Sequence, residues 1–317
     1  MEILTSLLSF IASYLIFPGL AFSALAGMLY MGVDRKLTGH MQNRIGPPIW
    51  QEFYDIGKLF LKEDITPKAS QSWLFNCAPM LGLGSIVTVM LLLPFLSQDP
   101  AVSLAADLIV IIYLLNIPAI CMMLGGYASA SPFGIVGASR YMVQLFGYEL
   151  VFIISVLAAA IRAGSLSLSA IVEFQSSEGP LVYQLKLLPA FLAVLIAVQG
   201  KLMRAPFHIP EAETEIIHGP LTEYSGPKLA LMRLAYDIET FAVFSLIAIL
   251  FLGGPIPLQI YGIEIPGVIM LLLKIFFILL ISTAFRNAVA RLRIDQALKL
   301  FWLFASLLAL VSLVLVV

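Results

Sequence analysis

The sequence predicts an all-α integral membrane protein: one bundle of about eight transmembrane helices, with an amphipathic helix on the cytoplasmic surface. Hydrophobic residues make up 61% of the 317 residues, charged residues only 12%, and the mean hydropathy is +1.00. A soluble domain carries about 25% charged residues. The apolar residues also gather in runs of about 20 or more, the length that crosses a hydrocarbon core of about 30 Å.

The predicted spans follow these apolar runs. The first starts directly after Glu2, without a basic n-region, and is longer than a signal-peptide core, so we expect a transmembrane helix there. Two polar loops, 34–73 and 204–227, separate apolar runs, and no soluble domain or repeat is visible, so residues 1–317 form a single domain. The eight spans are expected at about 3–33, 74–97, 102–127, 137–161, 184–203, 228–253, 266–285 and 298–317.

The distribution of positive charge predicts the orientation in a cell membrane. Of the 18 Lys and Arg residues, Arg162 and Lys186 lie on one side and Lys274 lies within a span, which leaves 15 on the other side. The Lys- and Arg-rich side of a membrane protein faces the cytoplasm. We therefore expect both long loops to be cytoplasmic and both termini to be outside. The net charge of −1 gives no reason to expect a nucleic-acid partner.

The cysteines argue against a redox centre in this chain. Cys77 and Cys121 stand alone in apolar runs, and the sequence has no CxxC and no HExxH motif. Iron–sulfur and similar centres need clustered thiolates. We expect no metal and no cofactor here, and both cysteines are expected in the core.

The first cytoplasmic loop contains a short amphipathic pattern. Apolar residues recur at helical spacing at Ile49, Phe53, Ile56 and Phe60, which predicts a helix over about 49–62 that is too short to span. Such a helix lies on the membrane surface with its apolar stripe inward. Polar residues fall off the stripe at Gln51, Glu52, Asp55, Lys58 and Lys62.

This loop resembles a known family. Its NRIGPP turn followed by QEFYDIGKLFLKEDITP is similar to the signature loop of NADH dehydrogenase subunit 1, the H subunit of complex I, and more similar to the equivalent subunit of energy-converting nickel–iron hydrogenases such as formate hydrogenlyase. The resemblance implies docking beneath a peripheral redox module, and in complex I a part in the quinone chamber. Only residues 48–50 separate Gly-Pro from Gln, whereas complex I members carry a longer glycine-containing stretch, which favours the hydrogenase-like branch. The matching positions are Arg44, Gly46, Pro47, Gln51, Asp55 and Lys58.

The fourth span carries a carboxylate near mid-membrane. Arg140, Gln144 and Tyr148 form one polar stripe, and Glu149 lies nine residues beyond Arg140, roughly 14 Å deeper. A carboxylate at that depth is a functional candidate by default, with a structural buried pair as the alternative. GASRYMVQLFGYELVF resembles the fourth-helix motif of the family, which implies a place for Glu149 in the proton path; Arg140 is assigned to the docking loop surface.

The second loop, RAPFHIPEAETEIIHGPLTEYSG, is the strongest motif. If 211–218 is helical, Glu211, Glu215 and His218 share one face. A solvated acidic loop and a metal site are the plain alternatives. The resemblance instead implies a gate between the redox chamber and the membrane interior, although His208 replaces a frequent Asp and Gly-Pro-Leu follows His218, a hydrogenase-like detail. The acidic residues concerned are Glu211, Glu213, Glu215 and Glu223.

Further charges fall within the spans. Asp237 and Glu239 lie inside the sixth span and Lys274 inside the seventh, where an amine must snorkel or pair with an acid. Asp107, near the outer end of the third span, can simply be solvated. Together they suggest a polar path from Glu213 through Glu149 and Asp237 toward Lys274.

Three functions fit a membrane protein with buried charges. The first, implied by the resemblance, is a non-catalytic membrane subunit that couples a redox reaction to proton or sodium translocation. Hydrogen evolution fits the motif details best, with sulfur or quinone reduction as alternatives. The expected partners are a hydrogenase-like large subunit, an iron–sulfur small subunit, antiporter-like and small membrane subunits and the lipid bilayer; iron–sulfur clusters and a NiFe centre would belong to those subunits.

The other two functions explain less of the sequence. A stand-alone secondary transporter would be expected to show repeat symmetry and paired broken helices, and the sequence shows no such pair. A passive anchor would leave the charges within the spans unexplained.

Overall fold

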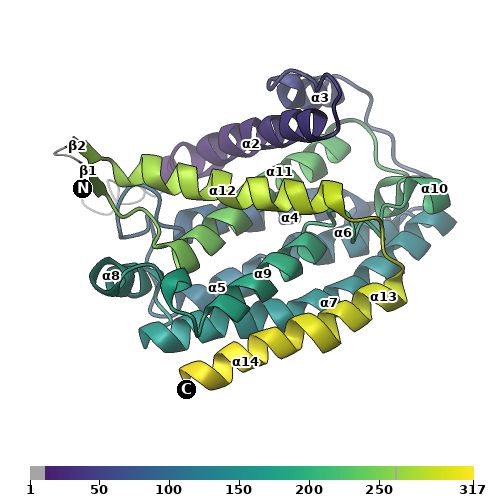
Figure 1. Cartoon of the computed structure of the whole chain (residues 1–317). Helices are drawn as coiled ribbons and strands as arrows, with labels where there is room; N and C mark the ends of the chain where they lie inside the picture. The colour runs from purple at the N-terminus through teal and green to yellow at the C-terminus, as the bar shows by residue number, and fades with distance from the viewer. Residues whose placement is uncertain (1–10, 261–262) are drawn as a thin grey trace.

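In the computed structural model, which describes residues 11–260 and 263–317, the long helices lie side by side in one bundle (Figure 1). The helices are α2 (Leu20–Met41), α3 (Gln51–Phe60), α4 (Ser72–Leu92), α5 (Asp107–Leu114), α6 (Ile117–Ala128), α7 (Pro132–Ala163), α8 (Leu168–Glu178), α9 (Leu188–Lys201), α10 (Glu213–Ile216), α11 (Gly226–Leu252), α12 (Gly267–Ala288), α13 (Ile294–Lys299) and α14 (Ser306–Val316). Two short turns, η1 (Leu181–Tyr183) and η2 (Gly219–Leu221), and a π-helical stretch, η3 (Leu300–Ala305), complete the helical part.

The all-α membrane fold predicted from the sequence is confirmed. Within the described residues, seven helical stretches are long and apolar enough to span: Ile11–Met41, Ser72–Leu92, Asp107–Ala128, Pro132–Ala163, Gly226–Leu252, Gly267–Ala288 and Ile294–Val316. The remaining predicted span, 184–203, is α9, whose 14 residues extend about 21 Å, less than a hydrocarbon core. Residues 3–10 of the first predicted span lie outside the described part of the chain.

A small hairpin departs from the all-α prediction. Strands β1 (Leu258–Ile260) and β2 (Ile263–Ile265) pair antiparallel, with Leu258 opposite Ile265. The hairpin joins α11 to α12 at the end of the bundle where the C-terminus lies, and α10 lies at the other end (Figure 1). Strands of three residues are too short to produce a recognisable pattern beside apolar runs of about 20 residues.

Helix α11 forms the centre of the bundle. In its most apolar stretch 94% of the residues are buried, whereas only 33% are buried in α12 and 28% in the stretch that ends in α14. It packs against α2, α3, α4 and α12. Phe241 stacks on Phe95 with ring centroids 5.9 Å apart, and its centroid lies 5.3 Å from that of Tyr30. A helix that is apolar on all sides belongs in a core, so Asp237 and Glu239 are carried into the middle of the protein.

The third predicted span is interrupted. Helix α5 ends at Leu114 and α6 begins at Ile117, with Pro118 as its second residue. Proline has no N–H to donate to the preceding turn, so a break is expected at this place. The break puts Asn116 between the two helices, where its side chain can form hydrogen bonds with residues of other helices.

The buried face of helix α3 coincides only in part with the predicted stripe. Its buried residues are Glu52, Ile56 and Leu59, and Phe60 of the predicted stripe is 47% exposed. Of the other stripe residues, Ile56 is buried and Ile49 and Phe53 are half-buried. The amphipathic helix predicted in this loop is therefore confirmed, and its place on the membrane surface stays a prediction. The helix packs against α2 and α11, where Glu52 meets arginines.

The second loop is less helical and more buried than predicted. Only Glu213–Ile216 is α-helical, so the condition of a helix over 211–218, on which a shared face of Glu211, Glu215 and His218 depended, is not met. Ile217 has a φ of 60°, and Gly219-Pro220 follow, which ends any helix there. Before α10 the chain runs through the interior, with Phe207 and Ile209 buried.

Candidate functional site

A charged cavity opens inside the bundle between the two loops. Its volume is about 420 Å³, and its wall comes from α2, α3, α6, α11, α12 and the second loop. Four methionines supply much of the apolar wall: Met31, Met122, Met203 and Met232. The charged and titratable wall residues are Asp34, Arg35, Glu52, Arg204, His208, Glu211, His218, Arg233, Tyr236, Asp237 and Arg286.

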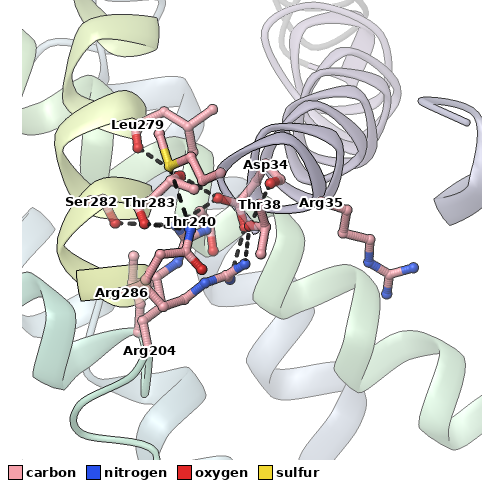
Figure 2. Close-up of polar contacts among 12 residues, drawn as sticks. Asp34, Arg35, Thr38, Arg204, Thr240, Leu279, Ser282, Thr283 and Arg286 are labelled. Atoms are coloured by element: carbon pink, nitrogen blue, oxygen red, sulfur yellow. Dashed lines mark hydrogen bonds and ion pairs between the residues drawn. The ribbon is translucent and has the colours of Figure 1, made fainter. Parts of the chain in front are cut away.

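Asp34 is the centre of a buried ion-pair network in the cavity wall (Figure 2). Its side chain is fully buried and accepts hydrogen bonds from Arg286 at 3.0 Å, Arg204 at 3.4 Å and Thr283 at 2.5 Å. Arg286 also donates to Thr38. Because buried charges need partners, this network ties α2 to α12 and to the loop after α9.

A second network joins α2 to α3. Arg35 Nη1 lies 2.9 Å from Glu52 Oε2 and 3.1 Å from Asp55 Oδ2, and Gln51 donates to Asp55 at 2.8 Å. Burial raises the pKa of Glu52 although Arg35 and Arg233 oppose it. Burial also acts to raise the pKa of Asp55, but the hydrogen bonds from Gln51 and Arg35 hold it below its usual value.

The acidic loop is split between two sites. His208 Nε2 lies 3.4 Å from Glu211 Oε2, and this bond raises the pKa of His208. Glu211 and His218 both line the charged cavity. Glu215 lies outside it and bridges Arg140 at 2.5 Å and Arg291 at 3.2 Å, and the bond from Arg140 lowers the pKa of Glu215.

The other two acids of this loop lie apart from both pairs. Glu213 is exposed and Glu223 is half-buried. The four acids therefore form no single carboxylate cluster.

Glu149 lies in a third group, near the middle of the 32-residue helix α7. Its Oε1 accepts a hydrogen bond from the Asn116 amide at 2.6 Å, and the Asn116 oxygen accepts one from Lys201 at 2.9 Å. Asp237 instead lines the charged cavity. The structure thus places Glu149 and Asp237 in different surroundings. The two residues belong to separate polar groups, so the direct path between them suggested by the sequence is not seen as a chain of contacts.

Glu239 lies beside the charged cavity. It lines a small void of about 20 Å³ together with Pro118, Tyr141 and Tyr236. The void shares Met122, Met203, Met232 and Tyr236 with the wall of the larger cavity. A space of this size holds about one water molecule.

Lys274 and Asp107 bind backbone at the far end of the bundle. Lys274 donates to the carbonyl of Gly254 at 2.8 Å, just beyond α11, where the helix dipole favours a cation. The Lys274 amine is thus satisfied by a backbone carbonyl, and not by the snorkelling or the acid pairing that the sequence led us to expect. Asp107 is fully buried and accepts from the Leu104 N–H at 2.5 Å and from Ser167 at 3.4 Å, so its expected solvation is wrong.

The signature turn of the first loop packs closely on α2. A Cβ placed on Gly39 would lie 2.7 Å from Gly46 Cα, so two glycines let the chain cross here, and Pro47 follows directly. Arg44 and Lys58 are exposed, and Arg44 donates to Gln42 at 2.9 Å. Large apolar side chains are also exposed along this loop at Ile45, Trp50, Tyr54, Phe60, Leu61 and Ile65.

Sequence reasoning missed several of the polar residues described above. Five of them are charged and stand at or near the ends of apolar runs, where a charge is easily counted as solvated, whereas the sixth, Asn116, stands in the middle of the third predicted span. The signal was their place within or beside a predicted span. These residues are Asp34, Arg35, Asn116, Lys201, Arg204 and Arg286. Within 11–260 and 263–317, no group of three or more His, Cys, Asp or Glu side chains is arranged to hold a metal.

Comparison with known proteins assigns the chain to a family. The family model for NADH dehydrogenase matches residues 14–317. The chain belongs to the NADH dehydrogenase family. The H subunit of NADH-quinone oxidoreductase from Bacillus thuringiensis (strain Al Hakam) is 34% identical over 303 residues, which cover 92% of this chain and 90% of that protein. The same protein of Bacillus cereus (strain AH187) matches equally, at 34% identity over 303 residues with the same coverage.

A solved structure shares the family fold. A chain of the membrane-bound sulfane sulfur reductase, an archaeal respiratory membrane complex, superposes with a TM-score of 0.84 at 26% identity, covering 93% of this chain and 96% of that chain. The family resemblance predicted from the three motifs is thereby confirmed, and the closer likeness to hydrogenase subunits stays a prediction. The family member described here is a multi-pass membrane protein whose two signature loops border one charged cavity.

Proposed function

We propose that this chain is the membrane subunit that couples a redox reaction in a peripheral module to ion translocation through the membrane. The observation that carries the proposal is the cavity of about 420 Å³ inside an apolar bundle, with charged residues from four helices and a loop in its wall. Charges in a membrane interior are expensive and mark ion pathways. Here they gather where both signature loops meet.

The first loop supports the docking part of the proposal. Its exposed apolar side chains and the exposed Arg44 and Lys58 form a surface suited to a large partner, since contiguous exposed apolar patches mark interaction sites. Gly46 and Pro47 shape its turn, Asp55, which accepts a hydrogen bond from Gln51, fixes α3 to Arg35, and Arg140 holds the acidic loop through Glu215. The partners proposed are a hydrogenase-like large subunit and an iron–sulfur small subunit, with their iron–sulfur clusters and NiFe centre, and antiporter-like and small membrane subunits.

The proposed ion path begins at the acidic loop and continues inward from the cavity. Glu211 and Asp237 line the cavity, and Glu239 lines the small void beside it. Glu149 lies beyond, and Lys274 and Asp107 lie toward the far end. Glu213, Glu215 and Glu223 would act at the entrance, with the loops cytoplasmic and the termini outside in a plasma membrane.

The electron acceptor is the finer part of the proposal. The motif details favour proton reduction to hydrogen, while the related proteins named above are a quinone oxidoreductase subunit and part of a sulfane sulfur reductase. Purifying the whole complex and identifying its large soluble subunit decides among the three acceptors. The proposed coupling role is common to all of them.

The coupling role is tested by Asp237→Asn in the assembled complex in vesicles. Ion uptake per electron transferred should fall about tenfold or more, because a carboxylate that transfers protons is replaced by an amide that cannot. Asp99→Asn, an exposed aspartate outside the cavity, is the matched control and should leave the ratio unchanged. An unchanged ratio in Asp237→Asn with normal assembly would remove the cavity from the ion path.

A further inference from the structure

Lys201 is a charged residue in an enclosed place. The positive-charge distribution assigns it to the cytoplasmic side, yet the residue is only 2% exposed. Its Nζ lies 5.4 Å from the centroid of the Tyr148 ring and 5.5 Å from that of Phe152. The hydrogen bond to Asn116 Oδ1, at 2.9 Å, supplies a polar partner.

The chemistry of the three groups fixes the direction of their hydrogen bonds. A lysine ammonium has three donors and no acceptor. The amide oxygen of Asn116 must therefore face Lys201, which leaves the NH₂ group to donate to Glu149 Oε1 at 2.6 Å. An amide polarised in this sense stabilises positive charge at Lys201 and negative charge at Glu149.

The surroundings make each charge dependent on the other. Glu149 Oε2 is buried without a hydrogen-bond partner among the described residues, so Asn116 is its polar link to the protein. Two carboxylates act on Lys201 by their charge, Glu239 on α11 more strongly and Glu149 less strongly, but of the two it is Glu149 that Asn116 links to Lys201 by hydrogen bonds. Removing one member of a buried charge pair is costly, whereas removing both can be nearly neutral.

We propose that Lys201 is the counter-charge that stabilises negative charge on Glu149, and that Asn116, held in the break between α5 and α6, transmits its effect. Lys201 is a positioning residue here. Asn116 transmits an electrostatic effect but no proton, because a side-chain amide neither gains nor loses a proton near neutral pH. A proton must therefore reach Glu149 by a route other than Lys201. Such a route can come from the outer face of α7, because Glu149 is half-buried there and its neighbours Phe146 and Leu150 are exposed.

The inference rests on the proposed function only for its effect on transport, and its test needs no transport. In the purified whole complex, the thermal midpoint should fall by several degrees in Lys201→Met and recover by more than half in Lys201→Met/Glu149→Gln. Infrared spectra should show a protonated-carboxyl band in Lys201→Met that is absent from the wild type. The band should disappear in Lys201→Met/Glu149→Gln and persist in Lys201→Met/Glu239→Gln, which assigns it to Glu149 rather than to Glu239. Lys201→Arg should keep the wild-type spectrum.

Equal midpoints in Lys201→Met and in Lys201→Met/Glu149→Gln, with no new carboxyl band, would overturn the proposal. If Lys201→Met does not assemble but Lys201→Met/Glu149→Gln does, the pairing is supported. If neither assembles, Asn116→Leu decides: a new band that Glu149→Gln removes supports the bridge, and an unchanged spectrum overturns it. Normal ion uptake in Asp237→Asn together with these band changes would reject the proposed function and leave the pair intact.

Discussion

At the scale of single residues, Asp34 shows how a charge is kept inside this membrane protein. The carboxylate has no exposure, and two arginines and a threonine donate to it. Asp34→Asn should destabilise the assembled complex by about 3–5 kcal/mol, because it leaves two arginines facing a neutral group in the interior. Thermal unfolding measures the change. Asp99→Asn should stay within about 0.5 kcal/mol, and an equal effect of the two variants would contradict the network.

The pair of His208 and Glu211 predicts a pH dependence. The bond to Glu211 raises the pKa of His208, so its stabilisation is fully present below the unfolded pKa of about 6.5 and is lost as pH rises through the higher folded value. In Glu211→Gln the fall in thermal midpoint above about pH 6.5 should be smaller than in the wild type. Glu213→Gln, an exposed neighbour, is the control and should keep the wild-type slope. Parallel slopes in wild type and Glu211→Gln would refute the assignment.

The residues that hold the site together could be predicted only in part. Glu149, Glu211, Asp237 and Glu239 were recognisable because a carboxylate inside or beside an apolar run stands out. Their partners were not, since Asn116 is an uncharged residue near a proline, and Lys201 stands at the cytoplasmic end of a predicted span, where a lysine is expected. A partner is defined by the packing of helices far apart in sequence, which no local pattern contains.

At the scale of elements, apolar runs predicted the long helices well, because crossing a bilayer demands length and hydrophobicity alone. The short helices were harder to predict. The buried face of α3 is set by Arg35 and Arg233 on two other helices, which receive Glu52. Likewise α9 ends deep enough for Lys201 to bond Asn116, so the following residues 204–210 pass through the interior.

The orientation of α3 sharpens the docking prediction. Lys58 is exposed on this helix, while Asp55 is tied to Arg35. Lys58→Cys should therefore cross-link to a large peripheral subunit with higher yield than Asp55→Cys. Lys186→Cys, exposed beyond the opposite end of the bundle, should give no such product. Labelling of lipid or membrane subunits alone from Lys58→Cys would show that α3 is not the docking surface.

At the scale of the whole molecule, burial is graded across the bundle. Helix α11 is enclosed, whereas α12 and the stretch that ends in α14 bury about a third of the residues in their most apolar parts. Those outer helices expose apolar side chains such as Leu273, Phe277, Leu303 and Val314. Lipid or neighbouring membrane subunits are expected to cover them, as in any bundle whose outer solvent is hydrocarbon.

The enclosure of α11 also limits which parts of the protein can move during turnover. A helix that is packed on every side cannot slide or rotate without opening voids in the core, and a close-packed interior disfavours such voids. The acidic loop is different, because Glu215 fastens it through two surface arginines that water can reach. We therefore expect α11 to keep its position during turnover, while conformational change is confined to the segment around α10 at the surface. Any charge transfer along α11 would then proceed without movement of the helix.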